Sequence, residues 1–163
     1  MTRRQEFVQN VKQEIENNSI YVYGGQGELL EQITISKLQS METPANVERI
    51  LKHVADVYPK GTKRARIFDC SGLLTYHLIK LGALMWDTTA DGLYKKCKPI
   101  TKRELLPGDF VFTVKNGKAS HVATVIEVNG EVIKLGEAVG RDVGVAETTL
   151  TTKFNKYGRF PGL

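Results

Sequence analysis

The sequence predicts an α+β fold in which helices come first and an antiparallel sheet follows. Up to residue 96, apolar side chains recur at the spacing of amphipathic helices. From residue 110 onward, β-branched and aromatic runs are separated by two Asn-Gly turn signals. The chain has 163 residues, about the size of one domain, and 41% of them are hydrophobic. We therefore expect residues 1–163 to form a single domain.

Four helices are expected in the first part of the chain, three of them from an apolar stripe at helical spacing. Thr43 can cap the second helix and Pro44 can occupy its first position, whereas Pro59 and Gly61 end it. Gly82 is the expected terminator of the third helix. The predicted helices span residues 2–18, 43–61, 69–82 and 88–96.

The predicted strands are separated by turns at Asn116-Gly117 and Asn129-Gly130, dipeptides that suit tight hairpins. An aromatic and β-branched run over residues 20–28 is broken by three glycines, and residues 29–43 fit neither pattern. The strand-like runs are "FVFTV", "HVATVIEV", "EVIKL" and "VGVAETTL".

The charge balance favours anionic partners, because the net charge is +5 and the pI is near 9.2. The basic clusters "KGTKRAR" and "KKCKPITKR" lack the interleaved aromatic residues of a base-stacking platform. We therefore expect a solvated basic surface and no nucleic-acid role. No apolar run approaches the roughly 18 to 20 residues of a membrane span, and "MTRRQEFVQN" lacks the apolar segment of a secretory signal.

One of the two cysteines, Cys70, stands in "RIFDCSGLLTYHLIKLG", after an aspartate and at the start of a predicted helix. A thiol attacks as the thiolate, which is scarce at neutral pH because the ordinary pKa is about 8.5. A helix N-terminus and a neighbouring imidazolium both favour the anion. Cys70 is therefore a candidate nucleophile, and an inert buried thiol is the alternative. A disulfide with Cys97 would exclude catalysis, and neither cysteine has the partners of a structural zinc site.

Three histidines are candidates for the base that Cys70 needs. His77 lies seven residues further along the same helix. It is therefore about 10 Å away, beyond hydrogen-bond reach. His53 falls off the apolar stripe of its helix and is expected to be a solvated surface residue. His121 opens the strand-like run "HVATVIEV", where a base is held firmly and stays accessible, so His121 is the candidate by elimination.

The second nitrogen of a catalytic imidazole is usually oriented by a polar partner. Glu137, in "LGEAVG", can accept that hydrogen bond, whereas Lys134 cannot. Asp142 is a weaker candidate because it lies in a predicted turn. These assignments depend on how the strands pair, which the sequence does not give.

Six segments between Ile20 and the closing "YGRFPGL" follow one another in a characteristic order: "YVYGGQGE", "FDCSGLLTYHLIKLG", "TTADGLYKKC", "LLPGDFVF", "HVATVIEVNGEVI" and "GEAVGRDVGV". Together they resemble the NlpC family of papain-like cell-wall cysteine peptidases, and look most like the versions found in phages and mobile elements. "DCSG" before an apolar helix, LxPGD and a strand-opening histidine downstream are the most specific parts. The order of cysteine before histidine is unlike that of the circularly permuted acyltransferase relatives.

The resemblance implies a papain-like fold, with the catalytic cysteine at a helix N-terminus packed on a C-terminal antiparallel sheet. It implies that Cys70 is the nucleophile and His121 the general base. Glu137 takes the place of the third catalytic residue, where the family often has His, Asn or Gln. The residues implied in substrate binding are Tyr21, which shapes the pocket, and Asp69 and Ser71, which hold a free peptide amine.

The activity implied by the resemblance is hydrolysis of peptidoglycan stem peptides through an acyl-enzyme, at the bond between D-glutamate and the following diamino acid. Two alternatives stay open: a CHAP-type N-acetylmuramoyl-L-alanine amidase, and a non-catalytic phage-tail or wall-binding module. No metal or organic cofactor is implied. We expect a monomer whose partners are wall peptide and, in a phage, tail or envelope proteins.

Two features bear on how such a protein would act. Because no secretory signal is seen, we expect delivery by a virion, release on lysis, or a cytoplasmic role in recycling wall peptides. Many family members place the Gly-Gly segment only a few residues before the DCSG helix. Here residues 29–65 intervene, and we expect this insert to wall the groove or to narrow substrate choice.

Overall fold

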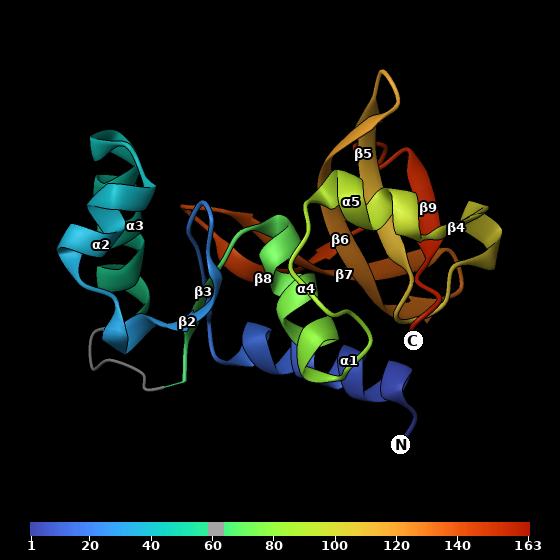
Figure 1. Ribbon diagram of the computed structural model, residues 1–163. Coiled ribbons are helices and arrows are strands. Elements are labelled where there is room, and N and C mark those ends of the chain that lie inside the picture. The colour runs from blue at the N-terminus through green and yellow to red at the C-terminus, as the bar shows by residue number, and fades with distance from the viewer. Residues whose placement is uncertain (59–63) are drawn as a thin grey trace.

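The computed structural model describes residues 1–58 and 64–163 and has an α+β fold. Helices α1 (Arg3–Glu16), α4 (Cys70–Lys80) and α5 (Ala90–Lys96) pack on a six-stranded antiparallel sheet (Figure 1). The predicted order, with helices before the large sheet, is confirmed. Within the described part of the chain, no helix has both the length and the apolar character needed to cross a membrane.

The strands of the large sheet, in chain order, are β4 (Lys98–Ile100), β5 (Phe110–Lys115), β6 (Lys118–Asn129), β7 (Val132–Gly140), β8 (Gly144–Thr149) and β9 (Lys156–Arg159). Their order in space is β4-β9-β5-β6-β7-β8. β5 and β6 are joined by the predicted Asn116-Gly117 turn, whose φ angles of 53° and 74° suit a type I′ hairpin. The sequence did not predict the two short strands β4 and β9.

A second, three-stranded sheet precedes α4 in the chain and was not predicted. It consists of β1 (Ile20–Tyr21), β2 (Gln26–Leu29) and β3 (Arg66–Phe68), with β1 parallel to β3. Gly25 lies so close to β3 that a Cβ there would be 2.8 Å from the Phe68 nitrogen. This close approach explains why the turn between β1 and β2 needs glycine.

Helices α2 (Ile35–Met41) and α3 (Pro44–Val57) form a separate unit beyond the small sheet, and of the large sheet the turn between β7 and β8 reaches it (Figure 1). As predicted, Thr43 caps α3, whose first residue is the proline. The predicted end of this helix, at Pro59 and Gly61, lies outside the described residues. The apolar side chains that join the unit to the small sheet are Ile20, Val22, Leu38, Val47, Ile50 and Ile67. The short 3-10 helices are η1 (Leu30–Gln32) and η2 (Lys102–Glu104).

The main core lies between the three helices α1, α4 and α5 and the large sheet. Phe7 and Val11 of α1, Leu73 of α4 and Phe110 of β5 are completely buried there. Gly136 of β7 leaves room for α1, since a Cβ at this position would lie 2.4 Å from the Val11 side chain. The helix therefore packs directly on β7, one residue before the predicted third catalytic residue.

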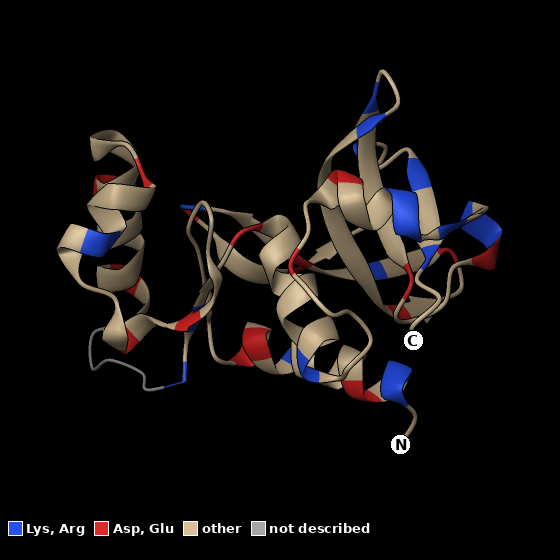
Figure 2. Ribbon diagram, in the orientation of Figure 1, with Lys and Arg blue, Asp and Glu red and all other residues tan. Residues whose placement is uncertain are grey.

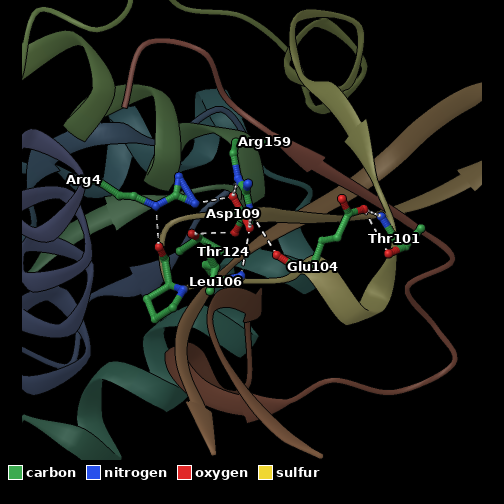
Figure 3. A network of polar contacts seen from close by, with 8 residues as sticks. Arg4, Thr101, Glu104, Leu106, Asp109, Thr124 and Arg159 are labelled. Atoms are coloured by element: carbon green, nitrogen blue, oxygen red, sulfur yellow. Dashed lines mark hydrogen bonds and ion pairs between the residues drawn. The ribbon is translucent and has the colours of Figure 1, made fainter.

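Asp109, the acidic residue of the LxPGD segment, is fully buried and joins three parts of the chain (Figure 3). Its carboxylate accepts hydrogen bonds from the Leu106 backbone N–H at 2.9 Å and from Arg159 of β9 at 2.8 and 2.7 Å. It also pairs with Arg4 near the start of α1. The Asp109 carbonyl accepts a bond from the Thr124 hydroxyl at 3.1 Å. In this fold, the aspartate of the motif is a structural residue.

The positive charge is unevenly distributed over the surface. Lys and Arg gather on the part of the molecule formed by α5, β4, η2 and the β5–β6 hairpin (Figure 2). The exposed basic residues of these elements are Lys95, Lys96, Lys98, Lys102, Arg103, Lys115 and Lys118.

Candidate active site

Cys70 is the first residue of α4, as the sequence predicted. Asp69 caps the helix by accepting the Gly72 N–H at 2.7 Å, and it also accepts the Gly24 N–H at 3.1 Å. Burial raises the pKa of Asp69, while these two N–H bonds oppose the rise. A Cβ at Gly72 would lie 2.1 Å from the Gly25 carbonyl oxygen, so only glycine lets the helix start this close to the turn. The position of Cys70 is thus fixed from two sides.

Both cysteines are free, so the disulfide considered from the sequence is not formed. Cys70 is half-buried, whereas Cys97 is buried in the core. Burial raises the pKa of Cys97 to about 12, which makes that thiol inert. Cys70 alone has the exposure that a nucleophile needs.

His121 lies in β6, opposite the N-terminus of α4. The strand begins at Lys118, so His121 is its fourth residue and does not open it, as the sequence had suggested. The reason is the tightness of the Asn116-Gly117 turn, which lets Lys118 pair at once with Lys115. The imidazole is mostly buried and stacks on Phe154, with ring centroids 5.7 Å apart. The ring is therefore held within the sheet layer.

Glu137 lies on the neighbouring strand β7, where its side chain is 3% exposed. Its Oε1 accepts hydrogen bonds from His121 Nε2 at 2.7 Å and from Lys153 Nζ at 2.6 Å, and its Oε2 accepts one from the Thr148 hydroxyl at 2.7 Å. Burial raises the pKa of Glu137, but the three bonds outweigh it and bring the pKa to about 2. The carboxylate is therefore ionised wherever the protein is folded at ordinary pH.

The bond to Glu137 defines the tautomer of His121. A carboxylate only accepts, so Nε2 carries the proton and Nδ1 is the nitrogen available to the thiol. Burial lowers the pKa of His121, but hydrogen bonds with Cys70 and Glu137 outweigh it and raise the pKa to about 9. The arrangement can accept a proton from the thiol and stabilise the resulting imidazolium.

Tyr21, predicted to shape the substrate pocket, is a half-buried residue of β1 that packs against the same core as Cys70. Burial is the main reason why the pKa of its hydroxyl rises to about 12, and the nearby Cys70 and Asp69 add to the rise. The Arg141 guanidinium lies 5.1 Å from the centre of its ring. Ser71 is partly exposed, and its hydroxyl is 3.4 Å from the Asp69 carboxylate. The structure thus gathers all six predicted site residues around the start of α4.

The histidines and the aspartate that were not chosen as the base or its partner lie away from Cys70. His77 is buried in α4 with Nε2 3.4 Å from a carboxylate oxygen of Glu14. His53 is half-buried near Gly144, where a solvated position had been expected; a Cβ at that glycine would lie 3.2 Å from the imidazole. Asp142 forms an exposed ion pair with Arg49 at 2.6 Å.

Three residues of the site were not found from the sequence: Thr148, Lys153 and Phe154. Thr148 is in β8, and the other two lie between β8 and β9. Nothing in "TTLTTKFNK" marks them, because their approach to Glu137 depends on how β7, β8 and β9 pair. In the described part of the chain, no group of three or more His, Cys, Asp or Glu residues is arranged to hold a metal ion.

A cysteine at a helix N-terminus, next to a histidine that is hydrogen-bonded to a carboxylate on an antiparallel sheet, is the papain-like arrangement. The sequence profile of the NlpC/P60 family matches residues 55–154, more than half of the chain. This protein therefore belongs to the NlpC/P60 family. No curated protein matches the chain in sequence.

Solved structures share the fold at low sequence identity. The P60 domain of an antigen from M. avium subspecies paratuberculosis has a TM-score of 0.58 and 16% identity, with 98% of both chains covered. RipD from Mycobacterium tuberculosis, a non-catalytic NlpC/p60 domain protein adapted to peptidoglycan binding, has a TM-score of 0.59 and 15% identity, again with 98% of both covered. The peptidoglycan hydrolase RipB from the same organism has a TM-score of 0.57 and 16% identity, with 96% of this chain and 66% of that one covered.

These neighbours include both a hydrolase and a non-catalytic protein. The shared fold alone therefore does not assign an activity to this chain. That assignment depends on the residues of the site.

Proposed function

We propose that this protein is a cysteine peptidase that hydrolyses amide bonds in peptidoglycan stem peptides. The observation that supports it is the arrangement of Cys70 close enough to His121 to raise the pKa of the imidazole, with His121 hydrogen-bonded to Glu137 at 2.7 Å. The cysteine stands where a helix N-terminus favours an anion, and the histidine is backed by a buried carboxylate. A protein that only binds wall peptide has no need of this arrangement.

In the proposed reaction, Nδ1 of His121 takes the proton of the Cys70 thiol, and Sγ attacks the carbonyl carbon of the scissile amide. Backbone N–H groups at the start of α4 would stabilise the negative charge that develops on the carbonyl oxygen. The imidazolium then gives its proton to the leaving amine. Water, deprotonated by His121, cleaves the resulting thioester and restores the thiol.

We assign the bond between D-glutamate and the following diamino acid as the scissile one, and Tyr21, Asp69 and Ser71 as the substrate-binding residues. Asp69 supports this assignment because its carboxylate lies one residue from the nucleophile and offers an anion for a peptide amine. The basic surface over α5, η2 and the β5–β6 hairpin suits an anionic wall.

Two other functions remain as alternatives. An amidase of the CHAP type would cut between muramic acid and L-alanine with the same three residues. A non-catalytic wall-binding module is favoured by one observation, the shared fold of RipD. The presence of cysteine, histidine and carboxylate together in this chain favours an enzyme.

The cellular setting is part of the same proposal. We propose a monomer that reaches the wall in a virion or on lysis, in the manner of an endolysin, with recycling of wall peptides in the cytoplasm as the alternative. Mass photometry of the purified protein and detection of the chain in virions or in culture fluid would test these points.

Digestion of purified peptidoglycan by the wild type, Cys70→Ala and Cys97→Ala, followed by mass spectrometry, tests the activity. We expect fragments that end at D-glutamate from the wild type and from Cys97→Ala, and none from Cys70→Ala. Intact stem peptides that begin with L-alanine would identify an amidase. No fragments from any variant, with binding to the wall intact, would establish a binding module instead.

A further inference from the structure

Glu137, the third residue of the site, is ionised although its side chain is almost completely shielded from solvent. The Glu137 side chain is 3% exposed, and a buried carboxylate of this kind needs opposite charge nearby. His121 supplies that charge only while it is an imidazolium. During the half of the proposed cycle in which His121 is neutral, another cation has to balance the carboxylate.

Lys153 supplies that second cation. Its Nζ lies 2.6 Å from Glu137 Oε1, the same oxygen that accepts the hydrogen bond from His121. The ammonium also lies 5.0 Å from the centre of the Phe154 ring, which stacks on His121. Two consecutive residues after β8 thus contact the histidine side of the site, one through the carboxylate and one through the ring.

We infer that Lys153 is a positioning residue that balances Glu137 and thereby limits how strongly the carboxylate holds the proton on His121. Without the ammonium, the full charge of Glu137 would act on the imidazolium. His121 would then take the thiol proton readily but release it poorly to the leaving amine. A neutral amide as third residue would need no balancing charge. The role of Lys153 therefore depends on the third residue being a carboxylate.

The other charged groups around the pair are already engaged. On the helix side, the titratable groups facing His121 are Cys70 of α4 and, beside it, Asp69 and Tyr21. On α5, Asp91 binds the Ala119 N–H two residues before His121 and is itself paired with Lys95 at 2.7 Å. On α1, Glu14 accepts a hydrogen bond from the Ser19 hydroxyl at 2.6 Å, and its other oxygen lies 3.4 Å from His77 Nε2. Lys153 is therefore the cation that balances the charge of Glu137 when His121 is neutral, and the Thr148 hydroxyl beside it adds only a neutral hydrogen bond.

This inference rests on the proposed function, and its test measures the thiol without any substrate. The rate at which iodoacetamide alkylates Cys70 is followed against pH in a Cys97→Ala background, for Lys153→Met, Lys153→Arg and the control Lys134→Met. Lys134 is a fitting control because it is also half-exposed and contacts two carboxylates of the same sheet, Glu127 and Glu147. The side-chain nitrogens of His121 are titrated in parallel by NMR.

We expect Lys153→Met to move the alkaline limb of the alkylation profile, and the His121 titration, upward by about 0.5–1 pH unit. Lys153→Arg should restore both, and Lys134→Met should leave both unchanged. In a Glu137→Gln background, Lys153→Met should shift the alkaline limb of the alkylation profile less than it does in the protein that keeps Glu137. A lysine that only stabilises the fold would move none of these titrations.

Different outcomes overturn different claims. If wild-type alkylation follows only an ordinary thiol with no contribution from His121, the thiol–imidazole pair of the proposed function is wrong. If the wild type shows the pair but Lys153→Met leaves the titration in place, the role of Lys153 is wrong. If Lys153→Met raises only the KM for stem peptide, Lys153 binds substrate and the inference also fails.

Discussion

At the scale of single residues, Glu137 differs from a neutral third residue in what it does to the imidazole. An amide would orient His121 by a hydrogen bond alone, whereas the carboxylate also attracts its positive charge. That attraction contributes to a His121 pKa of about 9, despite burial that acts the other way. The protonated imidazole and the ionised carboxylate therefore stabilise each other as well as the site.

This mutual stabilisation predicts how folding stability depends on pH. The pKa of Glu137 falls from 4.5 to about 2 on folding, so its contribution is present above pH 4.5 and is lost as the pH falls toward 2. The pKa of His121 rises from 6.5 to about 9, so its contribution is full below pH 6.5 and is lost as the pH rises through 9. The pair should stabilise the fold most between about pH 4.5 and 6.5.

Urea unfolding of the wild type and Glu137→Gln measures this contribution. We expect the difference in free energy of unfolding to be largest near about pH 5.5 and to shrink at about pH 3 and pH 10. A difference that stays constant over this range would show that the residue acts only through packing.

At the scale of elements, Asp109 holds the start of α1, the turn before β5 and the strand β9 in one place. Its side chain is completely buried and accepts bonds from Arg4, Arg159 and a backbone N–H. We expect Asp109→Ala to lower the free energy of unfolding by about 3–5 kcal/mol, because two arginines lose their carboxylate partner and the Leu106 N–H loses its acceptor. Thermal and urea unfolding followed by circular dichroism would measure the loss.

The matched control for Asp109→Ala is Asp142→Ala. Asp142 also pairs with an arginine, Arg49, but its side chain is 62% exposed. Its removal should cost no more than about 1 kcal/mol. Equal losses in the two variants would mean that the buried network contributes no more than a surface ion pair.

The elements that could be predicted from the sequence are those whose signals are local. Thr43 and Pro44 predict the start of α3, and Asn116-Gly117 predicts the turn of the β5–β6 hairpin. The small sheet could not be predicted, because its strands have two to four residues and β3 pairs with segments more than 35 residues earlier. The start of β6 was misplaced because residues 118–120 look like a continuation of the turn.

The residues of the candidate site also divide into those with a local sequence signal and those without one. The place of Cys70 at a helix start could be predicted from the apolar helical run that follows it, and the place of His121 on a strand from "HVATVIEV". Their catalytic roles come from the resemblance and belong to the proposed function. Glu137 followed from the need for an acceptor on a nearby strand. Lys153 carries no local signal, because it meets Glu137 only after β8 and β9 have taken their places in the sheet.

At the scale of the whole molecule, helices α2 and α3 contact the part of the large sheet near the candidate site through two arginine–carboxylate pairs. The outer pair, Arg49 with Asp142, is exposed. The inner pair joins Arg141 to Glu42, just after α2, by bonds of 3.0 and 3.1 Å, and Glu42 also accepts the Tyr23 N–H at 2.6 Å. The segment with α2 and α3 thus reaches the residues that surround Tyr21.

The inner pair carries the last prediction, which concerns substrate selection. Glu42 is buried and holds Arg141 against the ring of Tyr21, beside the proposed nucleophile. In Glu42→Gln the charge that holds the guanidinium is lost, so we expect the KM for stem peptides to rise several-fold. The alkylation rate of Cys70 should stay unchanged, because Glu42 contacts neither the thiol nor the imidazole.

The control for Glu42→Gln is Arg49→Met, which breaks the outer pair alone. Because that pair is exposed on both sides, KM should stay near the wild-type value. Equal KM values in all three proteins would show that α2 and α3 have no part in substrate selection. A fall in alkylation rate with Glu42→Gln would instead show that these helices support the thiol itself, since loosening α2 would then have moved β1 and the start of α4 together.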